Sequence, residues 1–195
     1  MQRQYIKNDF SITTWELLKP YFDTLLNRPI DSALDLEKYI RDYNELGAVV
    51  GENMAWRYIK MSCDTANTNL RDSYNDFVQN IEPHMAPLSN DLNKKISDSV
   101  FVSEIQKSGY AIYLRSLKNS IALFREENIP LNTQLQELEQ QFGAINGEQS
   151  IEYNGEKMTL QKAAVYLKNT NREIREAVYH QIQNRRAQDL SLIHI

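Results

Sequence analysis

The sequence predicts an all-α protein, a multi-helix bundle with one small β-hairpin near residues 150–159. Glycine and proline are scarce, at six and five in 195 residues, while strong helix formers recur throughout. Apolar residues repeat at alternating spacings of three and four in several segments, which is the period of one helical face. A hairpin is indicated only at Asn154-Gly155, which supplies the two positive-φ positions of a type I′ turn.

The first helix is expected to begin at Thr13, because Glu16 follows three residues later in the spacing of a capping box. Pro20 lies inside the pattern and predicts a kink or a short first turn before Tyr21–Asn27. Pro29 then marks the end of this segment.

A second, long helix is expected from Asp31 onward, because its apolar residues fall on one helical stripe. The stripe consists of Leu36, Tyr39, Tyr43, Leu46 and Val50. Gly47 and Gly51 weaken the far end of this pattern, so we expect a break or bend before a further helical stretch at residues 52–65.

The middle of the chain predicts further helices that pack together. Residues 67–99 are helix-compatible, and Pro83 and Pro87 indicate a helix–helix turn. The strongest apolar periodicity comprises Tyr110, Leu114, Leu117, Ile121 and Phe124. It lasts only about two heptads, which is typical of packing within a bundle. A second stripe, which implies an antiparallel neighbour, comprises Leu131, Leu135, Leu138 and Phe142. Gly143 stands where a glycine would end that helix.

The hairpin turn fixes which residues face one another across the two strands. Ile151 pairs with Met158 as an apolar pair. Glu152 faces Lys157 as a pair of opposite charges. Both pairings are compatible with a stable antiparallel ribbon.

Two capped helices are predicted after the hairpin. Thr159 caps the first, and Thr170 with Glu173 forms a capping box for the second. We find no linker that separates these parts, so residues 1–189 are expected to form one helical region. The final segment 190–195, LSLIHI, breaks the preceding polar pattern and resembles the translated remnant of a sequencing adapter. It is therefore interpreted as a non-native tail.

Charge and hydropathy exclude several classes of partner. A net charge of −4 and a pI near 5.5 argue against nucleic acid, which requires clustered lysine and arginine. No apolar core of a signal peptide and no membrane span is seen, so we expect a cytoplasmic protein without membrane contacts. The single Cys63 lacks an activating neighbour and is expected to be a small packed side chain.

No catalytic, cofactor-binding or metal-binding residue can be assigned from motifs. No two of the three histidines stand at the one-turn spacing of a helical zinc site. His84, between two prolines, is interpreted as an exposed turn residue, and His180 as a surface or boundary residue of a helix. His194 belongs to the suspected tail. Trp56 and Tyr58 are interpreted as core or interface side chains rather than as a substrate subsite.

Three stretches together resemble the oligoendopeptidase F-like zinc metallopeptidases of the thimet oligopeptidase clan. They are AWRYIKMSCDT at 55–65, FREENIPLNTQLQELEQQFGAI at 124–145 and YNGEKMTLQKAAVYLKNTNREIREAVYHQI at 153–182. The resemblance extends from residue 1 to about residue 189 and concerns the N-terminal, non-catalytic part of the family.

The resemblance implies that these helices form one wall of a channel that admits short peptides. The family's zinc ligands and general base lie in a downstream HExxH helix, with a later glutamate as the third ligand, and this sequence contains none of them. The full-length parent is thus expected to be a zinc metalloendopeptidase that cleaves oligopeptides. This part alone is expected to be inactive, to bind no zinc and to pair with the missing C-terminal catalytic half.

A second hypothesis remains open. The chain could instead be a stand-alone helical module that binds peptides or proteins without catalysis. The first hypothesis predicts apolar faces exposed for the missing half, whereas the second predicts a well-packed surface.

Overall fold

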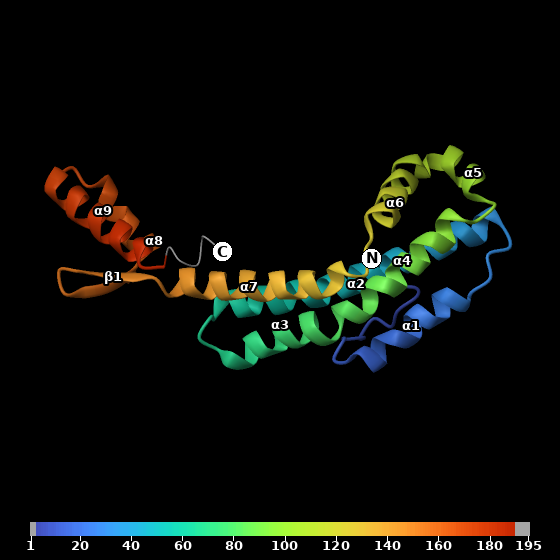
Figure 1. Cartoon of the computed structure of the whole chain (residues 1–195), viewed down its shortest axis with the longest axis horizontal. Coiled ribbons are helices and arrows are strands. Elements are labelled where there is room, and N and C mark those ends of the chain that lie inside the picture. The colour runs from blue at the N-terminus through green and yellow to red at the C-terminus, as the bar shows by residue number, and fades with distance from the viewer. Residues whose placement is uncertain (1–2, 190–195) are drawn as a thin grey trace. The chain divides into compact units, whose positions relative to one another are not determined.

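The computed structural model describes residues 3–189 apart from the side chain of Ser108. Within these residues the chain forms nine α-helices and one antiparallel two-stranded sheet (Figure 1). The predicted all-α class with a single hairpin is therefore confirmed. The suspected tail at 190–195 lies outside the described residues, so its interpretation stays a prediction.

The chain divides into two compact units, Met1–Glu137 and Leu138–Ile195. The helices of the first unit are α1 (Trp15–Asn27), α2 (Ala33–Cys63), α3 (Thr68–Asn80), α4 (Glu82–Ser97), α5 (Val102–Ile105), the π-helical turn η1 (Gln106–Tyr110) and α6 (Ala111–Leu123). Helix α7 (Asn128–Glu148) contains the division between the units. The second unit holds β1 (Ser150–Tyr153), β2 (Glu156–Thr159), α8 (Leu160–Ala164), the 3₁₀ turn η2 (Val165–Lys168) and α9 (Arg172–Ala187). None of the helices within residues 3–189 has both the length and the apolar character needed to cross a membrane.

Helix α2 is the centre of the first unit and packs against α1, α3 and α5 (Figure 1). Its predicted stripe forms much of the core, because Leu36, Tyr39 and Leu46 are completely buried. Tyr43 and Val50 are half-buried and pack against the same cluster. Burial of each such side chain stabilises the fold by roughly 1.5–3 kcal/mol.

The predicted break in α2 is wrong, because the helix is continuous for 31 residues through Gly47 and Gly51. A glycine in a helix interior costs only about 1 kcal/mol relative to alanine. Buried side chains before, between and after these glycines, at Leu46, Val49 and Met61, outweigh that cost. The helix begins at Ala33, where the Ser32 side chain accepts a hydrogen bond from the backbone N–H of Asp35.

The prolines act at positions other than those predicted. Helix α1 begins after Thr14, one residue later than the predicted capping residue, and Pro20 lies inside it. The helix–helix turn falls at Ile81, because Pro83 occupies the first turn of α4, where a missing N–H costs nothing. Pro87 lies within α4, so the turn does not extend to it.

Helices α6 and α7 differ in how their predicted stripes are used. On α6, Leu114 and Leu117 are buried in the core, as predicted. On α7 no described side chain is buried. The predicted stripe of α7 is 44–58% exposed, at Leu131, Leu135, Leu138 and Phe142. The prediction that this stripe packs against a neighbouring helix of the chain is therefore wrong. Gly143 does not end the helix, which continues to Glu148.

The second unit packs the hairpin against α8 and α9. The predicted register is confirmed, with Ile151 opposite Met158. Asn154 and Gly155 have φ angles of 55° and 75°, as a type I′ turn requires. Thr159 caps α8 as predicted, but Asn171 rather than Thr170 caps α9. The apolar core of this unit consists of Ile151, Met158, Leu160, Ala163, Val178 and Ile182.

Candidate functional site

The described histidines do not assemble a catalytic site. His84 is exposed as predicted but lies in the first turn of α4 rather than in a loop, and its ring stacks on Trp15 with the centroids 5.3 Å apart. His180 is exposed on α9, edge-on to Tyr179. His194 lies outside the described residues.

The described residues do not provide the ligand set of a zinc ion. Among residues 3–189 no three His, Cys, Asp or Glu side chains lie close enough to hold a metal. Cys63 is exposed at the end of α2. The predicted packing of its side chain is therefore wrong. The buried side chain of this last turn is Met61, and Cys63, two residues later, lies on another side of the helix.

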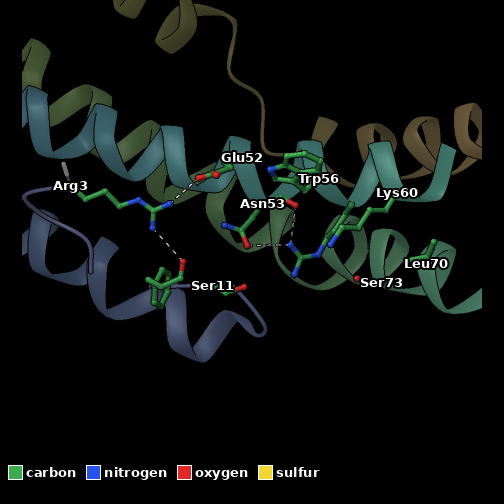
Figure 2. Close-up of a pocket in the computed structure, with 10 residues that line it drawn as sticks. Arg3, Ser11, Glu52, Asn53, Trp56, Lys60, Leu70 and Ser73 are labelled. Carbon is green, nitrogen blue, oxygen red and sulfur yellow. Dashed lines mark hydrogen bonds and ion pairs between the residues drawn. The ribbon is translucent and has the colours of Figure 1, made fainter. Parts of the chain in front are cut away.

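The candidate site is a cavity of about 420 Å³ lined by the N-terminal segment, α2 and α3. Figure 2 shows Glu52, Asn53, Trp56 and Lys60 on one face of α2, with Leu70 and Ser73 on α3. The complete lining consists of Arg3, Phe10, Ser11, Glu52, Asn53, Trp56, Arg57, Lys60, Leu70 and Ser73. This volume lies within the range of small-molecule sites, roughly 300–1,000 Å³.

Glu45 on α2 fixes the N-terminal segment that forms one side of the cavity. Its Oε1 accepts hydrogen bonds from the backbone N–H groups of Tyr5 and Ile6 at 2.8 and 2.7 Å, and its Oε2 accepts one from Gln4 at 2.8 Å. Burial alone would raise the pKa of this carboxyl, but the three N–H donors together lower it below its usual value. The ionised form of Glu45 therefore anchors the segment.

Arg3 and Glu52 form an ion pair at one end of the cavity, with Nη2 and Oε2 2.8 Å apart (Figure 2). Arg3 Nη1 also donates to the backbone carbonyls of Lys7 at 3.2 Å and Phe10 at 3.4 Å. The Arg3 charge is thus compensated by a carboxylate within the site itself.

Arg57 lines the cavity with its guanidinium engaged by neighbouring groups, and no described carboxylate forms an ion pair with it. Its guanidinium donates to the carbonyls of Asn53 and Ile12 and lies 4.8 Å from the centroid of the Phe77 ring. Burial lowers its pKa, and the nearby negative charge of Asp76 opposes that effect. The result is a partly dehydrated cation in a fixed position.

Lys60 and Trp56 complete the open side of the cavity. Lys60 is exposed, and no described residue forms an ion pair or side-chain hydrogen bond with it. Trp56 is 55% exposed, so it is not a core residue. Its alternative interpretation, as an interface side chain, stays a prediction. Three cations and one carboxylate line the site, which leaves a local surplus of two positive charges on a chain whose net charge is −4. The site can hold an anion next to an apolar group, but it does not contain a nucleophile paired with a base.

The comparison with known proteins identifies the family. Residues 7–124, more than half of the chain, match the family profile described as the Peptidase M3 N-terminal domain. The chain belongs to the peptidase M3 family. No curated protein matches it. The resemblance to the N-terminal part of this family, predicted from the sequence, is confirmed.

The fold of this M3 N-terminal part is also found in a crystal structure of a protein assigned as oligoendopeptidase F. The two superpose with a TM-score of 0.85 at 15% sequence identity, over 97% of this chain and 34% of that one. The M3 chain thus spans about one third of the length of that protein. All cavity residues except Arg3 lie within the region that matches the M3 profile.

Proposed function

We propose that this chain is the N-terminal part of a zinc-dependent metalloendopeptidase that hydrolyses short oligopeptides in the cytoplasm. In this proposal its helices form one wall of the substrate channel. The observation that carries the proposal is the M3 family match over residues 7–124, together with a fold shared over 97% of the chain with one third of an oligoendopeptidase F.

The catalytic chemistry belongs to another part of the parent protein. The described residues contain no metal-ligand cluster. In this proposal the zinc ligands lie in another part of the parent protein. A bound zinc ion supplies an activated water at neutral pH. This chain contributes binding and positioning of the peptide, and by itself it is expected not to cleave one.

An exposed apolar face of α7 supports the idea that a further part of the polypeptide packs here. Leu131, Leu135, Leu138 and Phe142 recur at the spacing of one helical face and are 44–58% exposed. The hydrogen bonds from α7 to α3 and α4 use other positions, since Glu137 accepts from Gln79 and Gln136 donates to Glu82. Several exposed apolar side chains on one helical face indicate an interaction site rather than a face adapted to solvent.

The proposal is tested by peptide hydrolysis with an internally quenched fluorogenic oligopeptide. The full-length parent should cleave it, a chelator should abolish cleavage, and added zinc should restore it. The 195-residue chain should show no hydrolysis with or without zinc. Chelator-insensitive cleavage by the parent, or zinc-dependent cleavage by this chain alone, would contradict the proposal.

A further inference from the structure

We propose that the cavity lined by the N-terminal segment, α2 and α3 binds a carboxylate of a peptide, with Lys60 and Arg57 as the cations and Trp56 as the apolar wall. The inference deepens the proposed function by assigning the chemical group that this part of the protein recognises. It rests on the proposed function only in taking the ligand to be a peptide.

The distribution of charge selects an anion. The Glu52 carboxylate is already paired with Arg3, with Oε2 and Nη2 2.8 Å apart. Neither Arg57 nor Lys60 forms an ion pair within residues 3–189. Asp76 acts on Arg57 through space without an ion pair. Two cations without an ion-pair partner on adjacent turns of one helix attract a negatively charged group, and a carboxylate accepts hydrogen bonds from both ammonium and guanidinium donors.

The position of Arg57 is fixed before any ligand arrives. Its Nη atoms are engaged by the carbonyls of Asn53 and Ile12, and the Phe77 ring supports one face of the guanidinium. None of these bonds uses Nε, which has no hydrogen-bond acceptor among residues 3–189. A preorganised cation loses little conformational freedom when it binds, which favours affinity.

The remaining lining suits the apolar and polar parts of a peptide next to its carboxylate. Trp56 presents an exposed indole, and Leu70 on α3 is a half-buried residue of the same lining. The Ser11 and Ser73 hydroxyls can donate or accept hydrogen bonds with a backbone amide (Figure 2). The cavity of about 420 Å³ accommodates one or two residues of a peptide but not a folded protein.

Binding is measured by the fluorescence of Trp56 in a Trp15→Phe background, because the chain contains two tryptophans. The probes are an acetylated tripeptide with neutral side chains and a free C-terminal carboxylate, its C-terminal amide, and an amidated version with one aspartate. The free acid should change the emission saturably, and the neutral amide should bind at least about fivefold more weakly. The aspartate peptide distinguishes a side-chain carboxylate from a terminal one.

Lys60→Gln tests the assigned cation, and Lys118→Gln is the matched control, since Lys118 is also an exposed lysine on a helix of the first unit. Lys60→Gln should weaken binding of the free acid roughly fivefold, whereas Lys118→Gln should leave it unchanged. Circular dichroism should show both variants folded. Equal binding of acid and neutral amide, equal effects of the two variants, or displacement by inorganic phosphate as effective as by the free acid would overturn the inference. Such a failure would leave the peptidase proposal untouched, because that proposal is tested by hydrolysis in the parent.

Discussion

Replacement of Glu45 by glutamine should release the N-terminal segment from α2. The carboxylate accepts three backbone N–H groups, two on Oε1 and one on Oε2, at 2.7–2.8 Å. A glutamine keeps one acceptor oxygen and places an NH₂ group against the third N–H. Two charge-assisted bonds thus become neutral, and one is lost.

The magnitude follows from the difference between these kinds of bond. A hydrogen bond to a charged group contributes about 1.5–3 kcal/mol and a neutral one about 0.5–1.5 kcal/mol. Because Glu45 is partly exposed, we expect a total loss of about 2 kcal/mol from the free energy of unfolding of the first unit. The control is Glu37→Gln on the same helix. Glu37 Oε2 lies 3.7 Å from Arg41 Nη1, which makes a long ion pair. Its effect should stay below about 0.5 kcal/mol.

The effect should depend on pH in a defined direction. The pKa of Glu45 is lowered in the folded protein, so its contribution is complete above the ordinary value of about 4.3 and is lost as pH falls through the folded pKa. The gap in stability between the wild-type chain and Glu45→Gln should therefore be full at pH 7 and narrow below about pH 4. At low pH the neutral carboxyl and the neutral amide become similar.

Urea unfolding followed by tryptophan fluorescence measures this gap, because Trp15 and Trp56 both lie in the first unit. The midpoint should fall for Glu45→Gln with an unchanged denaturant slope. A gap no larger than that of Glu37→Gln, or one that widens as the pH is lowered to 3, would refute the assignment of Glu45 as the anchor of this segment.

Three further predictions concern the helices and their surfaces. Gly47→Ala and Gly51→Ala should each raise the free energy of unfolding by about 0.5–1 kcal/mol in the urea assay, because an added Cβ meets nothing within 4 Å. Gly155→Ala, at φ +75° in the second unit, should instead destabilise that unit in urea unfolding followed by circular dichroism. Tyr39→Phe should be neutral or stabilising by up to about 1 kcal/mol by thermal unfolding, because the buried hydroxyl of Tyr39 has no hydrogen-bond partner among residues 3–189. Leu135→Glu should reduce the binding of a hydrophobic dye to the isolated chain, since Leu135 is 54% exposed; dye emission equal to that of the unmodified chain would exclude the α7 face as the apolar surface.

Local patterns in the sequence were sufficient to predict most elements of the fold. The stripe from Leu36 to Val50 predicted the buried face of α2, since spacing alone determines which residues share a helical face. The hairpin register followed from Asn154-Gly155, because a two-residue turn fixes all later pairs. The break in α2 predicted from Gly47 and Gly51 was wrong, because burial of side chains along a long helix outweighs the low helix propensity of single glycines.

The candidate site could not be predicted in the same way. The Arg3–Glu52 pair and the three bonds from residues 4–6 to Glu45 join positions about 40 or more residues apart in the chain, and periodicity contains no information on such contacts. One signal was available, since Glu52, Asn53, Trp56 and Lys60 occur at helical spacing and carry polar groups around a tryptophan. The exposure of the α7 stripe was equally hidden, because an apolar face shows that a partner exists but not whether the partner belongs to the same segment.

The most direct test of the proposed peptidase function is to determine the coding sequence of the source locus with long reads through and beyond codon 189. If the chain is the N-terminal part of a zinc metallopeptidase, the reading frame should continue into a segment that encodes an HExxH helix, without the codons for LSLIHI. A genuine stop codon directly after Ile195 would contradict this proposal and would favour a non-catalytic helical module.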